Sequence, residues 1–226
     1  MPLATTFANA SARAYGFGGG GERFSASVTY VSGADGRAAG STFPFTATST
    51  AVGDWLFIMA DGVNASGVSG GSGATWTKVT LTNAGGLITT LFYRRLVSGD
   101  AGATFTVNGL LNAGPVEWVA YRGAISVAQR QTSISALNAS TLVFSAQVPA
   151  QGSGRLVAFV SSHGTFHTGS WSAPANWTAR VSVDAIGPKY IGDILSSVYN
   201  QATITFTSTQ AQPEGQVGWL FEFIGS

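Results

Sequence analysis

The chain contains no cysteine, and only 9% of its 226 residues are charged. The absence of cysteine excludes disulfides and thiolate metal sites. The net charge is +1, and apart from Arg94-Arg95 the basic residues are scattered. Nucleic-acid-binding domains usually cluster Lys and Arg, so we expect no nucleic-acid partner.

So low a charge also bears on association. A surface with few charges and a net charge near zero promotes self-association. We therefore expect other subunits to cover much of the surface, in a homo-oligomer or a larger assembly. A soluble domain with a Ser, Thr and Asn surface is the alternative.

Long apolar segments are missing as well. No stretch approaches the roughly 20 apolar residues of a membrane-spanning helix, so we expect no membrane partner. The first residues lack the basic start and apolar run of a signal peptide. No segment keeps apolar residues at helical spacing over three turns, which argues against long amphipathic helices.

Short β patterns fill the chain instead. Residues 55–59 form a continuous apolar run bounded by Gly53-Asp54 and Asp61-Gly62, as expected for a strand buried on both faces. Residues 76–81 alternate between polar and apolar. Gly and Asn clusters separate many such segments at short intervals, which is typical of a sandwich. The sequence predicts an all-β protein, a β-sandwich of the jelly-roll or Ig-like type.

Matching residues recur at one ungapped offset of 101 positions. The matched pairs include Trp76 and Trp177, Trp118 and Trp219, Phe43 and Phe144, and Phe105 and Phe206. This pattern predicts two tandem, sequence-related repeats, residues 22–123 and 124–226, with the matched tryptophans in the core. The repeats form either two sandwiches or one larger sandwich.

The first 21 residues stand outside the repeats. They are rich in Ala, Ser and Gly and include Tyr15, Gly16, Phe17 and Gly18. Glycine at this density does not hold regular structure by itself. The segment is either a frayed terminus or an assembly arm that becomes ordered on a neighbouring subunit.

The second repeat has candidate ligand-facing residues without a match in the first. His163 and His167 lie in a Gly- and Thr-rich loop, where helical metal-binding geometry is not expected. Trp171 and Tyr190 are either a sugar-stacking surface or local core filling. We predict no metal and no cofactor.

Two patterns resemble catalytic or nucleotide-binding motifs but lack the context. Residues 16–21 match G-x-G-x-x-G, yet a strand follows where a dinucleotide site needs a helix. Residues 67–71 match G-x-S-x-G around Ser69, but no helix follows there either. We predict no catalytic residues and no enzyme activity.

A series of motifs in the first repeat is similar to a group of phage and prophage proteins. It runs through Gly53-Asp54, Trp76-Thr77-Lys78-Val79, Gly85-Gly86, Phe92-Tyr93-Arg94, Gly99 to Thr106, and Tyr121-Arg122-Gly123. The chain resembles β-sandwich virion structural proteins of the tail-fibre or capsid-decoration type over residues 41–226. The second repeat follows the pattern more loosely.

This resemblance implies a virion protein that is assembled in the cytoplasm of a bacterial host. Its partners would be other virion proteins and copies of itself. We therefore expect a non-enzymatic structural component of a phage particle. The alternative is a glycan-binding or receptor-binding adhesin module that recognises a host surface glycan, and a hydrolase is a third hypothesis.

Overall fold

The computed structural model describes residues 27–225 except 39, 62–64, 111–113, 150–153, 163–167, 184, 200–201 and 210–214. Over these residues the chain is built of strands and turns without a helix, so the predicted all-β class is confirmed. No helix among them is long and apolar enough to cross a membrane.

The first half of the chain holds eight strands: β1 (Thr29–Arg37), β2 (Thr42–Thr46), β3 (Trp55–Asp61), β4 (Gly67–Gly70), β5 (Thr77–Thr82), β6 (Ile88–Arg95), β7 (Thr104–Asn108) and β8 (Pro115–Arg122). The second half holds β9 (Ala124–Ile134), β10 (Thr141–Phe144), β11 (Arg155–Ser162), β12 (Thr168–Gly169), β13 (Trp171–Ser172), β14 (Thr178–Val183), β15 (Ala185–Ile186), β16 (Lys189–Leu195), β17 (Ile204–Ser208) and β18 (Gln216–Gly225).

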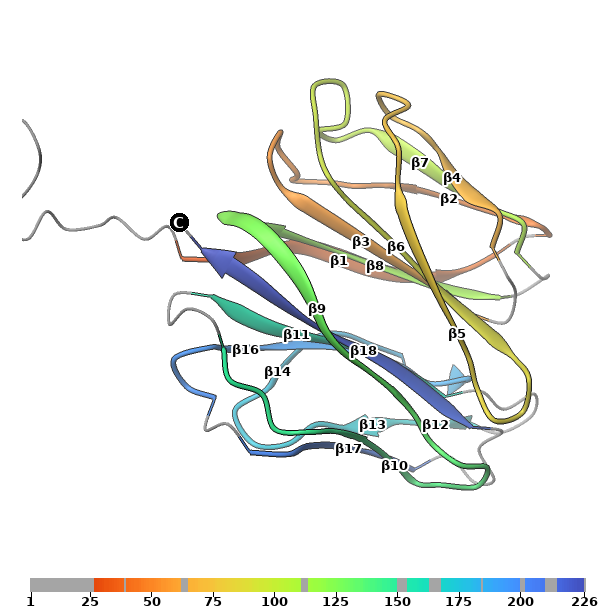
Figure 1. Ribbon diagram of the computed structural model, residues 1–226. Coiled ribbons are helices and arrows are strands. Elements are labelled where there is room, and N and C mark those ends of the chain that lie inside the picture. Colours follow the sequence, from red (N-terminus) through yellow and green to blue (C-terminus); the bar gives the residue numbers. More distant parts are fainter. Residues whose placement is uncertain are drawn as a thin grey trace, which may run out of the picture.

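These strands form four stacked sheets and one short ribbon. Inner sheet 1 has the order β1-β8-β3-β6-β5, and outer sheet 1 has the order β2-β7-β4. Inner sheet 2 has the order β9-β18-β11-β16-β14, and outer sheet 2 has the order β10-β17-β13. From top to bottom in Figure 1 the layers are outer 1, inner 1, inner 2 and outer 2. The ribbon pairs β12 with β15.

Within each half the strand pairs are nested. In the first half β1 pairs with β8, β2 with β7 and β3 with β6. In the second half β9 pairs with β18, β10 with β17 and β11 with β16. First-with-last nesting across two facing sheets is the arrangement of a jelly roll rather than of an Ig-like sandwich.

A single glycine connects the two halves. Gly123 lies between the last residue of β8 and the first of β9 and adopts a φ of +87°. A Cβ atom at this position would lie 2.8 Å from the backbone oxygen of Ser27. Glycine therefore meets two needs here, the left-handed backbone and the close approach of a neighbouring strand.

Three hydrophobic cores separate the four layers. One core fills the space between outer and inner sheet 1 and contains Leu56, Ile58 and Trp118. Another lies between inner and outer sheet 2 and contains Leu156 and Phe206. The third, the central core, joins the two inner sheets. Both inner sheets are thus buried on both faces, which explains the continuous apolar runs of β3 and β11.

Aromatic rings dominate the central core. Phe57 of β3 packs against three rings of the other half, Phe159, Phe221 and Phe223, at centroid distances of 5.1, 5.2 and 5.1 Å. Tyr121 lies 4.8 Å from Phe223. Because these rings are in direct contact within one buried cluster, the two sandwiches form one body through their inner sheets.

The strand order of the two halves matches, but the ungapped register does not hold in space. Phe57 of β3 pairs with Tyr93 and Val119, whereas Val157 of β11 pairs with Asp193 and Phe221. The offsets are thus 100 residues for β3 and β6 and 102 for β8. In these three strands the spatial offset is even, and because side chains alternate along a strand, the offset of 101 places their matched residues on opposite faces.

The tryptophans illustrate this correction. Trp118 faces the first sandwich core, whereas Trp219, its match at the offset of 101, faces the central core. Trp76 and Trp177 do correspond, because each meets a phenylalanine of the matching strand edge-on, Phe105 and Phe206, at 5.6 and 5.3 Å. All four rings are core-packed, and tandem duplication stays a prediction.

Replacing Phe57 with alanine should test the central core. We expect the free energy of unfolding to fall by about 3–5 kcal/mol, because the ring leaves a cavity that its neighbours only partly fill. Chemical denaturation of the whole chain measures this. Val52→Ala, at a side chain that is 62% exposed, is the control and should change stability by less than about 0.5 kcal/mol. A Phe57→Ala variant as stable as the control would contradict a shared core.

Candidate functional site

A groove on the second sandwich is the best candidate for a binding site. It consists of two adjoining cavities of about 190 Å³ each, which share Asn176, Ile194 and Val198 in their walls. The turn between β13 and β14 and the turn after β16 form its sides. One cavity is aromatic and apolar, and the other is lined by charged side chains.

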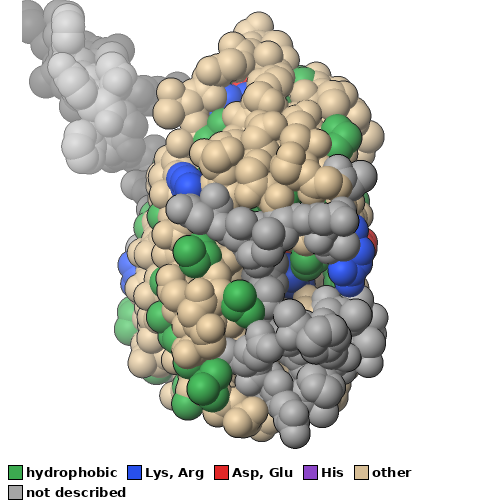
Figure 2. All heavy atoms as spheres, turned by 90° about the vertical axis from the view of Figure 1, so that its right-hand side faces the viewer, with side chains coloured by type: hydrophobic (Ala, Val, Ile, Leu, Met, Phe, Trp, Pro, Cys, Tyr) green, Lys and Arg blue, Asp and Glu red, His purple; other side chains and the backbone are tan. Residues whose placement is uncertain are grey.

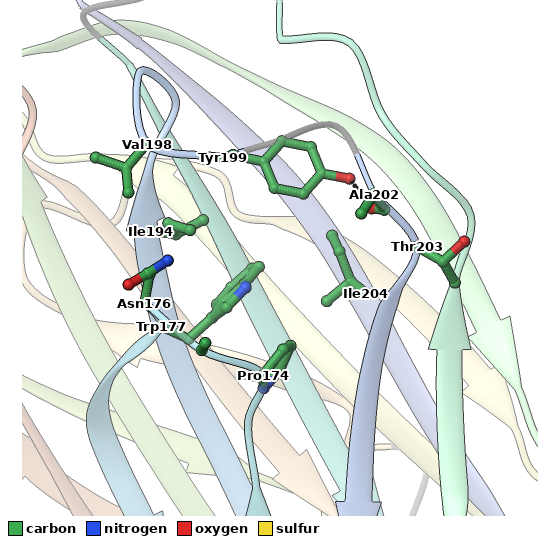
Figure 3. Close-up of a pocket in the computed structure, with 10 residues that line it drawn as sticks. Pro174, Asn176, Trp177, Ile194, Val198, Tyr199, Ala202, Thr203 and Ile204 are labelled. Atoms are coloured by element: carbon green, nitrogen blue, oxygen red, sulfur yellow. Dashed lines mark hydrogen bonds between the residues drawn. The ribbon is translucent and has the colours of Figure 1, made fainter.

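The aromatic cavity is shown in Figure 3. Trp177 and Tyr199 lie on either side of Ile194, with Ile204 and Pro174 closing the walls. Tyr199 is fixed at its hydroxyl, which donates to the carbonyl of Ala202 and accepts the backbone N–H of Gln147 at 3.1 Å. The tyrosine is nearly buried, whereas Trp177 is only half-buried. The indole is therefore the ring that a ligand can reach.

The turn that carries Trp177 requires an unusual backbone conformation. Asn176 has a φ of +70°, and the N–H of Trp177 donates to the carbonyl of Pro174 at 3.4 Å. Asparagine tolerates the left-handed region better than other side chains that are not glycine. The sequence Pro174-Ala175-Asn176 thus places the indole at the mouth of the cavity.

The corresponding place in the first sandwich is filled. Arg94 pairs with Leu56 on the neighbouring strand, as Ile194 pairs with Leu156. The Arg94 guanidinium lies 4.5 Å from the ring of Trp76, donates to the carbonyl of Ala74 and binds Asp100 at 2.5 Å. In the second sandwich the shorter Ile194 replaces the arginine, and the cavity lies beside the equivalent tryptophan.

Asp100 completes the group of side chains that fills the place beside Trp76 in the first sandwich. Burial alone raises the pKa of its carboxyl, but hydrogen bonds from the backbone of Ser72 and Val97 and the charge of Arg94 together lower the pKa below the ordinary value. A buried carboxylate held in this way is ionised and matched. The pair therefore closes the first sandwich instead of forming a reactive centre.

The charged cavity of the groove lies at the junction of the two halves. Asp193 is fully buried and accepts from Arg155 at 2.5 Å, from Arg180 at 2.7 and 3.1 Å, and from the Tyr121 hydroxyl at 2.9 Å. Arg155 also donates to the carbonyl of Val28, and Arg180 stacks on Tyr30 at 4.8 Å. Two guanidinium groups meet one carboxylate, so this end of the groove has an excess positive charge.

Burial and the nearby carboxylate both act on the tyrosines around Asp193. The pKa of Tyr121 is well above its ordinary value, first because the hydroxyl is buried and second because Asp193 is negative. The same two causes, in the same order, raise the pKa of Tyr190 to about 12. Both hydroxyls are therefore neutral near pH 7.

A second hollow, of about 290 Å³, lies beside Asp54 in the first half. Arg122 binds the Asp54 carboxylate with two nitrogens at 2.8 and 2.9 Å, and Arg95 also lines the hollow. No aromatic side chain contributes to its walls. It therefore offers a ligand fewer specific contacts than the groove does.

Of the four residues predicted to face a ligand, the structure buries two, and the other two lie outside the described residues. Trp171 is 6% exposed and donates its indole N–H to the carbonyl of Pro188 at 2.9 Å, and Tyr190 is 3% exposed. Both rings pack in the core of the second sandwich, so the structure places them inside and not on a ligand-facing loop. His163 and His167 lie outside the described residues, as do Tyr15, Gly16, Phe17 and Gly18 of the proposed arm.

The described residues contain no group of three or more His, Cys, Asp or Glu side chains that is suited to a metal ion. Ser69 of the G-x-S-x-G pattern lies within β4 and receives a hydrogen bond from the amide of Asn108 at 3.1 Å. A nucleophile elbow needs a sharp turn from a strand into a helix, and this backbone is extended.

No known protein family, curated protein or solved structure matches the chain. The candidate site therefore stands on its geometry alone.

Sequence reasoning missed the groove residues Trp177, Arg180 and Tyr199. The repeat comparison assigned Trp177 to the core. The ring does pack against Phe206, but it is only partly buried. A signal was available in the pair Arg94 and Ile194, since loss of a large charged side chain beside a retained tryptophan suggests an opened space. At the offset of 101 Arg94 falls on Leu195, which shows the same loss of charge one position further along the chain.

The stability of the protein should depend on pH in the alkaline range. Tyr190 has a raised folded-state pKa of about 12, so its neutral form stabilises the fold below the unfolded value of about 10. That contribution is lost as the pH rises from 10 towards 12. We expect denaturation midpoints to fall over this window, and to fall less in Tyr190→Phe. An identical decline in both proteins would contradict this assignment.

Proposed function

We propose that this chain is a non-enzymatic structural subunit of a bacteriophage particle, and that copies associate through one side of the second sandwich. The observation that carries the proposal is a group of exposed apolar side chains along β9 and β10. Its members are Ile134, Leu137, Val143 and Val148, which are between 44% and 66% exposed. They are called the β9–β10 edge below.

Hydrogen bonds hold the two strands of this edge together. The hydroxyl of Ser133 donates to the carbonyl of Val143 at 2.6 Å, and Arg130 donates to the carbonyl of Val148 at 2.8 Å. Ile134 and Val143 lie on these strands, and Leu137 and Val148 lie in the segments that follow them. A group of this kind on a soluble protein is typical of an interaction site.

The backbone supports association at the same place. β9 is the last strand of inner sheet 2, and β10 is the last strand of outer sheet 2. An edge strand has unpaired N–H and C=O groups on one side, which can pair with a strand of another chain. The β9–β10 edge thus combines apolar contact area with the backbone groups of two edge strands, although the Val143 carbonyl already accepts from Ser133.

Charge opposes association very little. Figure 2 shows a face on which basic and acidic side chains appear at only a few points, and the whole chain carries a net charge of +1. Two copies of nearly neutral protein repel each other weakly. A second copy of this chain is accordingly the partner we propose for the β9–β10 edge.

The phage context rests on two further arguments. The motif series of the first repeat resembles virion proteins, and jelly rolls occur in capsid and lectin domains. The fold by itself does not determine function. The double sandwich has the rigidity of a particle subunit, since its three cores join all four layers.

Sedimentation of the full-length chain tests the association. We expect the purified protein to form a multimer, and Val143→Glu to shift it towards the monomer because the variant places a charge in the apolar contact. Val52→Glu is the matched control, since this valine is exposed on the other half. A wild-type monomer at all concentrations, or equal effects of the two variants, would contradict the proposed edge.

The particle context has its own test. Imaging of purified phage particles with an antibody should locate the protein on them, and removal of residues 1–21 should abolish attachment. If purified particles lack the protein, the virion proposal is wrong, even if the isolated chain forms multimers.

A further inference from the structure

We propose that the groove of the second sandwich binds a carboxylated sugar residue, such as a uronic acid, of an acidic polysaccharide. This inference goes beyond the structural role, and it stands whether or not the chain forms multimers. In outline, the Trp177 indole stacks on the sugar ring, and Arg180 and Arg155 attract the carboxylate.

The two sandwiches differ in what lies beside their equivalent tryptophans, Trp76 and Trp177. The fold places a tryptophan at the same position in each, and in the first sandwich the Arg94 guanidinium covers its ring. In the second sandwich Ile194 leaves the indole beside a cavity of about 190 Å³. A flat group that stacks on the ring can therefore occupy the space that Arg94 takes in the first sandwich.

The charge of the neighbouring cavity selects the type of ligand. Arg155 and Arg180 share the single carboxylate of Asp193, which leaves one positive charge in excess. A cation such as the Arg94 guanidinium, which covers the tryptophan of the first sandwich, would be repelled by this excess positive charge. An anion would be attracted, and carboxylates match the planar donor geometry of guanidinium groups.

Donors remain for such an anion. The hydrogen bonds of Arg180 with described residues use Nε and Nη2, and those of Arg155 use Nε and Nη1. This leaves Nη1 of Arg180 and Nη2 of Arg155 without a partner among the described residues. Both arginines line the charged cavity.

The size and lining favour a sugar over a large cofactor. Cavities for drug-sized ligands measure roughly 300–1,000 Å³, whereas each of these two has about 190 Å³. One ring fits at the tryptophan, and a charged substituent reaches across Asn176 and Val198. Apolar walls with a few polar groups, here Asn176 and Thr203, are typical of a ligand site.

Two valines provide a matched pair of variants. Val198 lines both cavities and is 49% exposed, and Val97 lies on the corresponding turn of the first sandwich and is 43% exposed. Tryptophan at position 198 would cover the groove, whereas tryptophan at position 97 would leave it open. Both side chains are partly in solvent, so both variants should fold.

The experiment is calorimetric titration of the full-length chain with an oligogalacturonate, with the neutral galactose oligosaccharide of equal length and with inorganic phosphate. We expect the acidic sugar to bind, and the affinity to fall by about tenfold or more in Val198→Trp but not in Val97→Trp. Trp177→Ala should weaken binding similarly, because it removes the stacking ring.

The other outcomes each overturn the proposal. If the folded wild-type protein binds neither sugar, the groove is not a saccharide site. If the neutral oligosaccharide binds as tightly as the acidic one, the arginines do not select the ligand. Binding of phosphate alone would identify an anion site without a sugar, and equal effects of the two valine variants would place the binding elsewhere.

Discussion

The face-to-face packing of the two inner sheets is the constraint on which the rest of this structure depends. A sheet that is covered on both faces needs apolar residues at successive positions, and β3, β11 and β18 supply them. Phe57, Tyr121 and their partners fill the space between the sheets with aromatic rings. Because Gly123 alone links the halves, the chain has no freedom to hold the two sandwiches apart.

The halves share a strand order but differ in the space beside their equivalent tryptophans, Trp76 and Trp177. The first sandwich closes over its tryptophan with the ion pair of Arg94 and Asp100, which uses the charges internally. The second sandwich places its acidic residue, Asp193, at the junction of the halves, where it holds Arg155 and Arg180 beside an open groove. The first half therefore uses these charges internally, whereas the groove and the β9–β10 edge, which we propose as contact surfaces, both lie in the second half.

Much of the fold could be predicted from the sequence, since alternation, buried runs and Gly-rich turns are local signals. The all-β class followed from them, and the core position of Trp76 and Trp118 followed from the matched pairs at the offset of 101. The register between the halves did not, because turns of different length shift the matched strands, which are offset by 100 residues for β3 and β6, 101 for β5 and 102 for β8. For Trp171 and Tyr190, which have no match in the first repeat, the sequence leaves open a sugar-stacking surface or local core filling, and the structure shows core filling. For the groove the one sequence signal is the replacement of Arg94 by Ile194, since its walls come from separate turns that only the folded chain brings together.

The shared central core requires the two sandwiches to open as one cooperative unit. Native-state hydrogen exchange of the full-length chain tests this directly, because it measures the opening free energy of each strand. We predict that the amides of β3 and β11, on either side of the central core, exchange only through the same global opening. Exchange of β11 through a separate opening of much lower free energy, with β3 still protected, would contradict a shared core and show two independent sandwiches.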